Sequence, residues 1–329
     1  MHKKINWGII GLGKIANKFA SDLQLVNDSV LYAVASRDGE KAKKFGQKYG
    51  SKKFYGSYEE LADDPDIDVI YVATPHTYHF ENTMMCLKKG KGVLCEKPMG
   101  VNHQEVETMV GEAKSRNLFL MEGIWTRFIP ATTKLLEILE TKTIGEILFI
   151  RADFGFKATP NHEERIYNKK LGGGSLLDLG IYPIYLSLLT LGTPIDIKAM
   201  ARMTKTDVDG YCTMLFDYEN GAKASLESTI EASTPTEAII YGSKGSVKLH
   251  SKFHQSERLT ISQNGEKTVL NIKLTGNGYV HEIEEVNKCL LNGEIESKKL
   301  PLKLSTELIT LIDRVKVEIG LSYNSTMEN

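Results

Sequence analysis

The 329-residue sequence has no excess of charge of either sign. Its 41 Lys and Arg residues are balanced by 42 Asp and Glu residues, which gives a formal net charge of −1. Nucleic acids and anionic membranes select strongly basic surfaces. The composition therefore offers no electrostatic reason to expect either class of partner.

Cysteine is also scarce. The four cysteines, at positions 86, 95, 212 and 289, show no Cys-x-x-Cys spacing, which is the pattern typical of zinc and redox sites. We expect reduced, mostly buried thiols in a cytoplasmic protein. Asn6 and Lys14 interrupt the apolar residues of the N-terminus, so the sequence predicts no export signal.

Long hydrophobic runs are missing as well. The longest, residues 181–191, is too short to span a bilayer. With 41% hydrophobic and 25% charged residues, the composition is that of an ordinary folded protein. Single hydrophobic cores stop growing at about 250–300 residues, so we expect two domains.

The first third of the chain alternates short apolar runs with amphipathic ones, the pattern of parallel βαβ units. The apolar runs are continuous, as expected of strands that helices cover on both faces. The expected strands are 5–10, 30–35, 69–72, 93–95 and 119–121, and the expected helices are 16–25, 39–49, 58–63, 79–88 and 101–116. These runs predict an α/β fold that begins with a doubly wound parallel sheet.

After residue 122 the pattern changes to a helix at 132–140 and a series of runs typical of an antiparallel meander. In one of them, Ala222, Ala224, Leu226 and Ile230 share a face opposite polar residues, which predicts a sheet with one open face. The runs are 147–154, 195–204, 211–218, 222–230, 237–241 and 246–250, and helices at 279–291 and 305–319 follow. We predict one domain over 1–123 and a second, α+β domain over 124–329.

A glycine-rich turn joins the first strand to the first helix. In the pattern Gly-x-Gly-x-x-Ala, Gly11 permits a tight turn, Gly13 lets the backbone approach a pyrophosphate, and Ala16 allows close helix packing. Lys14 and Ile15 begin the helix, whose free N–H groups favour an anion. The alternative is a plain structural turn, but strand, turn and helix together predict a dinucleotide site of the Rossmann type.

The end of the second strand bears on which dinucleotide is bound. Ser36 and Arg37, with Lys41 one turn further on, suit the 2′-phosphate of NADP. Asp38 is the counter-argument, because an acidic residue here would bind the ribose of NAD. We favour NADP over NAD.

Ligands of such sheets bind at the carboxyl ends of the strands. Thr74, His76 and His79 follow the strand at 69–72, and we expect them to line the cofactor. Their His-x-x-His spacing lacks further ligands, so we predict no metal. After the strand at 93–95 come Glu96 and Lys97. Lys97 lies where it can polarise a reacting oxygen, although an exposed Glu96–Lys97 pair is the simpler alternative.

A second glycine-rich stretch, 172–174, precedes an apolar helix in the second domain. Asp178 and Tyr182 are four residues apart and so share a helix face. A nearby Lys cation would favour the phenolate of the tyrosine, which is otherwise a poor base at neutral pH. A core-facing Tyr182 with a capping or paired Asp178 is the alternative.

These motifs resemble, in order and spacing, the glucose-fructose oxidoreductase and inositol dehydrogenase (Gfo/Idh/MocA) family. They are Gly11 to Ala16, Thr74 to His79, Glu96-Lys97-Pro98 and Gly172 to Tyr182. Residues 119–128 and 177–182 look closest to its branch of dimeric dihydrodiol dehydrogenases and NADP-dependent D-xylose 1-dehydrogenases. Many family members have His where this chain has Tyr182, which favours that branch over inositol-type chemistry.

The resemblance implies a Rossmann domain at 1–123 and a substrate-binding, oligomerisation domain at 124–329 with a large, mostly antiparallel sheet. It also implies NADP and a homodimer or homotetramer formed through sheet faces. Lys97 and Tyr182 match the catalytic pair and Asp178 supports the site, while the cofactor and substrate pocket is lined by Trp125, Arg127 and Phe154. We therefore expect hydride transfer between NADP and a secondary alcohol of a sugar or cyclic diol. The alternatives are a keto-sugar reductase of the same family and a non-catalytic NADP-binding regulator.

Overall fold

The computed structural model describes residues 4–159, 161 and 164–323, and its chain forms two compact units. Among these residues, the first unit comprises those of Met1–Trp125 and Thr275–Thr306, and the second those of Thr126–Leu274 and Glu307–Asn324. The sequence placed all of 124–329 in one domain, whereas the structure groups Thr275–Thr306 with the N-terminal unit. Each unit is described separately.

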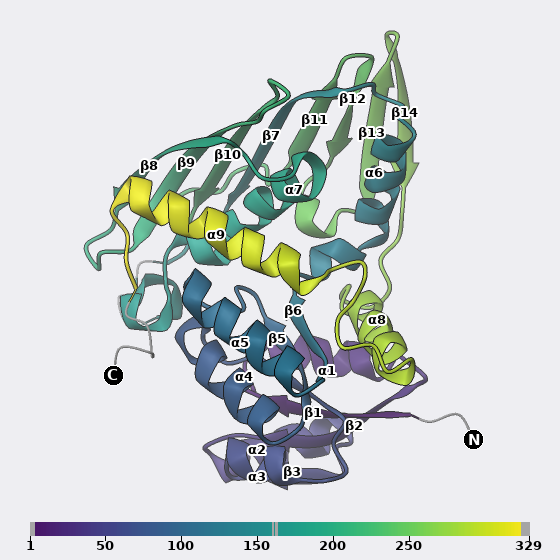
Figure 1. Ribbon diagram of the computed structural model, residues 1–329, viewed down its shortest axis with the longest axis vertical. Coiled ribbons are helices and arrows are strands. Elements are labelled where there is room, and N and C mark those ends of the chain that lie inside the picture. The colour runs from purple at the N-terminus through teal and green to yellow at the C-terminus, as the bar shows by residue number, and fades with distance from the viewer. Residues whose placement is uncertain (1–3, 160, 162–163, 324–329) are drawn as a thin grey trace. The chain divides into compact units, whose positions relative to one another are not determined.

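The first unit is built on a six-stranded parallel sheet in the order β3-β2-β1-β4-β5-β6 (Figure 1). Its strands are β1 (Ile5–Ile10), β2 (Ser29–Ala35), β3 (Lys53–Tyr55), β4 (Val69–Val72), β5 (Gly92–Glu96) and β6 (Leu120–Gly123). Its helices are α1 (Lys14–Leu23), α2 (Gly39–Tyr49), α3 (Tyr58–Asp63), α4 (His79–Lys88), α5 (His103–Ser115) and α8 (Val280–Leu291). The predicted doubly wound sheet is confirmed. The short strand β3, of which no residue is buried, was missed because it has no apolar run.

Two buried contacts explain why α8 belongs to the first unit. The indole N–H of Trp7, which is fully buried in β1, donates to the side-chain oxygen of Asn287 at 3.0 Å. The fully buried carboxylate of Asp22 in α1 accepts the backbone N–H groups of Asn277 and Tyr279, each at 2.9 Å. Buried polar groups need such partners, so these bonds fix the start of α8 against α1.

The second unit contains an eight-stranded sheet in the order β14-β13-β12-β11-β7-β10-β9-β8 (Figure 1). Its strands are β7 (Ile147–Gly155), β8 (Asp196–Met203), β9 (Asp209–Asp217), β10 (Lys223–Thr229), β11 (Ala238–Gly242), β12 (Gly245–Leu249), β13 (Arg258–Gln263) and β14 (Glu266–Asn271). The helices α6 (Pro130–Glu140) and α7 (Ile181–Leu191) pack against this sheet. The last helix is α9 (Leu302–Ile319).

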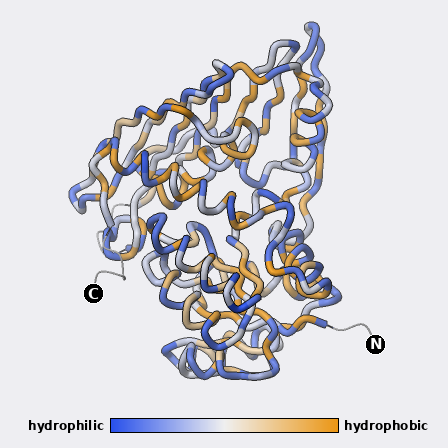
Figure 2. The backbone as a smooth tube through the Cα atoms, viewed as in Figure 1, coloured by the Kyte–Doolittle hydropathy of each residue, from blue (hydrophilic) through white to orange (hydrophobic). Residues whose placement is uncertain are grey.

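The sheet of the second unit differs from a simple meander in two ways. β10 runs parallel to its neighbour β7, with Ala224 opposite Ile150. The sequence predicted an antiparallel meander, so this pair is an exception to the predicted pattern. Strands β13 and β14 were missed. β14 is mostly exposed and has no buried face, so it carries no apolar pattern. Hydrophobic and hydrophilic residues alternate along the strands (Figure 2), and the predicted inner row, Ala222, Ala224, Leu226 and Ile230, is buried.

The apolar helix of the second unit lies in its interior. The segment Lys169–Leu191, 23 residues long, is long and apolar enough to cross a membrane, but 78% of its apolar part is buried inside the protein. Burial of this kind is typical of a core helix. All four cysteines are free and buried, as the sequence predicted.

Candidate active site

The glycine-rich turn after β1 has the geometry that the sequence predicted. Gly11 has φ +82°, and a Cβ there would lie 2.5 Å from the carbonyl of Ala73, so the turn requires glycine. A Cβ on Gly13 would meet nothing within 4 Å, so packing does not explain this glycine. Ala16 is fully buried beneath it. Gly13 thus leaves its backbone open to an approaching ligand.

The N-terminus of α1 follows this turn directly. In the described structure, Gly13 provides no side-chain cap, and the first turn, with Lys14 and Ile15 exposed, holds no acidic residue. The free N–H groups and the helix dipole therefore favour a negative charge. The residues present fit the pyrophosphate of a dinucleotide.

Residues at the end of β2 surround the first turn of α2. The carboxylate of Asp38 accepts the backbone N–H of Lys41 at 3.1 Å and so caps α2. Ser36 is buried, and its hydroxyl oxygen accepts the N–H of Asp38 at 3.2 Å. Arg37 is exposed and lies beside Tyr58 and Glu81, where its guanidinium opposes the rise that burial causes in the pKa of both groups.

The loop after β4 is tied to the loop after β5 through His79. One ring nitrogen of His79 lies 2.8 Å from the carbonyl oxygen of Thr74, and the other lies 2.7 Å from that of Pro98. His79 is fully buried, and His76 and Thr74 are nearly so. The structure thus shows His79 holding two strand ends together, while contact of these three residues with a cofactor stays a prediction.

Glu96 and Lys97 lie at the carboxyl end of β5. The hydroxyl of Tyr71 donates to one carboxylate oxygen of Glu96, and the backbone N–H of Lys97 donates to the other at 3.2 Å. Glu96 is buried and Lys97 is half-buried. These two hydrogen bonds fix the Glu96 carboxylate inside the protein, and the catalytic role of Lys97 stays a prediction.

The carboxyl ends of β5 and β6 carry further residues that the sequence did not single out. Glu122 is buried, and one of its oxygens accepts the backbone N–H of Met99 at 2.8 Å. Burial raises the pKa of Glu122 to about 7. Trp125, predicted to line the pocket, stacks on Tyr279 at 4.7 Å between ring centroids and an interplanar angle of 4°. Tyr279 comes from the segment beside α8, so no local pattern could have linked it to Trp125.

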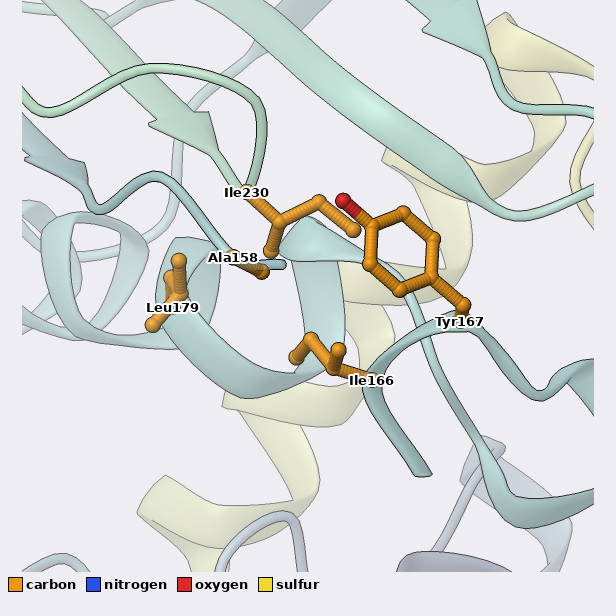
Figure 3. Close-up of a cluster of buried hydrophobic side chains, with 5 residues drawn as sticks. All are labelled: Ala158, Ile166, Tyr167, Leu179 and Ile230. Carbon is orange, nitrogen blue, oxygen red and sulfur yellow. The ribbon is translucent and has the colours of Figure 1, made fainter. Parts of the chain in front are cut away.

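In the second unit, Asp178 lies in a π-helical turn, Leu176–Gly180, that leads directly into α7. The Asp178 carboxylate accepts a hydrogen bond from the guanidinium of Arg165 at 2.8 Å. One residue of this turn, Leu179, belongs to a buried hydrophobic cluster (Figure 3). The cluster comprises Ala158, Ile166, Tyr167, Leu179 and Ile230. Asp178 is thus paired with Arg165, as the alternative of a paired Asp178 predicted.

Tyr182 forms part of a cluster of rings. The Phe154 ring lies 5.5 Å from that of Tyr182, and both face His254, at 4.5 and 4.9 Å respectively. Tyr182 and His254 are each 6% exposed. Arg127 is partly exposed in the short helix Trp125–Phe128. The structure thus places Phe154 beside Tyr182 and adds His254, which the sequence did not indicate, while contact of these rings with a substrate stays a prediction.

The glycines at 172–174 meet the chain itself. A Cβ on Gly173 would lie 2.6 Å from the carbonyl oxygen of Arg165, and one on Gly174, at φ +110°, would lie 2.2 Å from a carboxylate oxygen of Asp209. The other oxygen of Asp209 accepts the Ser175 hydroxyl and the N–H of Leu176, each at 2.7 Å. Asp209 therefore caps the helical segment that carries Asp178 and Tyr182.

Two buried carboxyls are thus added to the predicted set. Burial raises the pKa of Asp209 to about 7, although its hydrogen bonds from Ser175 and Leu176 oppose the shift. Within the described residues, no group of three or more His, Cys, Asp or Glu side chains is placed to hold a metal ion. The predicted catalytic lysine lies in the first unit and the predicted catalytic tyrosine in the second, so their pairing stays a prediction.

Comparison with known proteins matches both units to one family. Residues 5–124 match the model described as an oxidoreductase family with an NAD-binding Rossmann fold, and residues 132–248 match the GFO/IDH/MocA C-terminal domain. Trans-1,2-dihydrobenzene-1,2-diol dehydrogenases from Mus musculus and Homo sapiens are 38% and 37% identical to this chain. Each alignment covers 97% of the chain and 98% of the relative. The chain belongs to the Gfo/Idh/MocA family.

Solved structures agree with this assignment. A 3-ketoreductase from Actinomadura kijaniata in complex with NADP is 26% identical, with a TM-score of 0.88 and coverage of 96% of this chain and 98% of that one. An aldose-aldose oxidoreductase from Caulobacter crescentus, at 24% identity and the same TM-score, has the same fold. The enzyme is an NAD(P)-dependent oxidoreductase that acts on a small molecule.

Proposed function

We propose that the enzyme transfers a hydride between NADP and a secondary alcohol of a cyclic diol or sugar. One observation carries the proposal: dihydrodiol dehydrogenases match the chain over nearly its full length, at 38% identity for the mouse protein. The ring cluster around Tyr182 supports it, because apolar and aromatic surfaces suit the carbon skeleton of a dihydrodiol.

The proposed chemistry assigns roles to three residues. When bound, a nicotinamide supplies the hydride acceptor or donor. Tyr182 takes the hydroxyl proton from the substrate, and the ammonium group of Lys97 stabilises the negative charge that develops on the oxygen. Asp178, held by Arg165, orients the substrate side of the site.

The choice of NADP is supported by the end of β2. Asp38, the residue that argued for NAD, uses its carboxylate to cap α2 through Lys41. Arg37, two residues after the end of β2, remains exposed. A planar guanidinium suits a phosphate, and the related 3-ketoreductase was solved with NADP.

We also propose a cytoplasmic homo-oligomer, a dimer or tetramer, that assembles through the open face of the eight-stranded sheet. Apolar side chains are exposed there on separate strands: Met200 on β8 at 78%, Leu215 on β9 at 56% and Tyr241 on β11 at 39%. Exposed apolar patches of this kind are typical of protein interfaces. A second copy of the same sheet would cover them.

Reduction of a keto-sugar is the second candidate. The likeness to a 3-ketoreductase favours it, and the same proton donor and cation serve both directions of hydride transfer.

A substrate panel tests the proposal. The purified enzyme is incubated with NADP or NAD and a set of trans-dihydrodiols, pentoses and hexoses, and nicotinamide absorbance is followed. NADPH formation with a cyclic diol or sugar is the expected result. Reduction of keto-sugars without oxidation of any alcohol would support the second candidate, and no turnover in either direction would contradict both.

A further inference from the structure

Glu122 lies at the carboxyl edge of the parallel sheet and has no role in the proposed reaction. It is 3% exposed near the end of β6, opposite Cys95 in the register of β5. Its Oε1 accepts the backbone N–H of Met99 at 2.8 Å. Its Oε2 is buried as well.

The turn that Glu122 holds is the one that begins with Lys97. Met99 lies two residues after Lys97, and His79 bonds the carbonyl of Pro98 between them. A second carboxyl, Glu105 on α5, accepts the N–H of Val101 in the same loop at 2.9 Å. Two buried carboxyls therefore fix the backbone that follows Lys97.

Hydrogen bonding alone does not require an ionisable group at position 122. A glutamine would accept the same N–H and would avoid the cost of burying a carboxylate. The groups that act on the Glu122 carboxyl are Ser305, Lys97 and Glu96, and the Cys95 thiol also faces it. Burial raises the pKa of Glu122 to about 7, while the Ser305 hydroxyl, the Met99 N–H and then the Lys97 cation lower it and Glu96 raises it.

We propose that Glu122 is a positioning residue for Lys97, which both anchors the turn after Lys97 and, as a carboxylate, supplies negative charge beside the Lys97 ammonium group. The inference rests on the proposed function, in which Lys97 must be a cation to stabilise the developing oxyanion. A neighbouring carboxylate favours that cation. In its protonated form Glu122 keeps the anchor through Oε1 but loses the charge.

The coupling is measured without any substrate. Protein labelled with ¹³C at the Glu carboxyls is titrated by NMR, and Glu122→Gln assigns the resonance of Glu122. We expect a Glu carboxyl that titrates near pH 7, and we expect its midpoint to rise by at least about half a pH unit in Lys97→Ala, because the opposing cation is gone. An unchanged midpoint in Lys97→Ala overturns the proposal. If Glu122→Gln does not fold, the comparison of wild type with Lys97→Ala still decides.

Kinetics provide the second readout. In wild type, kcat should show an inflection near pH 7 that Glu122→Gln lacks, while the Kd for NADP changes by less than about threefold. Glu105→Gln is the matched control, because it alters the other anchor of the loop and should keep the inflection. Glu122→Asp, which retains the charge, should restore it in part. An inflection that persists in Glu122→Gln contradicts the proposal. If the wild-type enzyme turns over no alcohol or ketone, the proposed function is contradicted, and the NMR titration alone tests the role of Glu122.

Discussion

At the scale of single residues, the carboxylate of Asp38 has a structural role in the fold. From the sequence alone, Asp38 could bind the ribose of NAD or cap the helix that follows it. Its carboxylate caps α2 through the N–H of Lys41, and Arg37 next to it stays exposed. The preference for NADP therefore depends on Arg37.

Replacing Arg37 tests this preference. In the proposed NADP complex, Arg37→Ala removes a charge-assisted pair with the 2′-phosphate, so we expect the Kd for NADP to rise by about 10- to 100-fold. The Kd for NAD, which lacks this phosphate, should change by less than about threefold. Fluorescence titration of both cofactors measures the two constants. Equal losses for NADP and NAD would show that Arg37 does not read the phosphate.

The charge of Asp209 should affect the stability of the protein. Its pKa is raised from 3.8 to about 7 by burial, so the folded protein binds a proton that the unfolded chain releases. Between about pH 4 and 7 this group makes the free energy of unfolding fall as the pH rises. The effect is bounded at roughly 4 kcal/mol, since each pKa unit corresponds to about 1.4 kcal/mol.

Asp209→Asn removes this titration. As the pH rises from about 4 to 7, we expect the variant to become steadily more stable relative to the wild type, measured as the difference in their free energies of unfolding. Above about pH 7 this difference should stay constant. Urea unfolding at a series of pH values gives this difference. A difference independent of pH would mean that Asp209 is not protonated in the folded protein near neutral pH.

At the scale of elements, the start of α7 depends on a close fit between a glycine and a carboxylate. Gly174 has φ +110°, and a Cβ there would lie 2.2 Å from Asp209 Oδ1. The same carboxylate caps the helix through Ser175 and Leu176. The glycines at 172–174 thus serve the packing of the helix that carries Tyr182.

Gly174→Ala should therefore destabilise the protein by at least about 3 kcal/mol, because it combines a left-handed backbone with a steric clash. Gly221→Ala is the matched control: Gly221 has φ +82°, but a Cβ there meets nothing within 4 Å, so the expected loss is about 1–2 kcal/mol. Thermal or urea unfolding compares the two. Equal losses would show that the contact with Asp209 is unimportant.

The elements also show what the sequence could and could not predict. Strands β1 and β4 and helices α2, α3 and α4 have the predicted bounds, because buried parallel strands and capped helices have strong local patterns. The parallel pairing of β7 with β10 brings together segments far apart in the chain, and no local pattern encodes it. The same limit applies to the candidate site: motifs predicted roles for Lys97 and Tyr182, whereas Tyr279, His254 and Asp209 reach their neighbours only through the tertiary fold.

At the scale of the whole molecule, the balanced charge and the open sheet have a common consequence. A chain with a net charge of −1 has little long-range repulsion between copies. The exposed apolar residues of the sheet then favour self-association, as the proposed oligomer requires.

A charge placed on the open face tests the oligomer. Leu215→Glu, at a side chain that is 56% exposed on β9, should shift the enzyme toward the monomer, because a carboxylate would be desolvated at the interface. Val317→Glu, at an 80% exposed residue of α9, is the control and should keep the wild-type mass. Light scattering after size-exclusion chromatography measures both. A wild-type mass for Leu215→Glu would place the interface elsewhere.

The most direct test of the proposed chemistry is the turnover of Lys97→Ala and Tyr182→Phe with NADP and the best alcohol of the panel. We expect kcat to fall by at least about a hundredfold in each, which is within the range of lost general acid–base or electrostatic catalysis, while the Kd for NADP changes by less than about threefold. Wild-type-like kcat in either variant would contradict the mechanism.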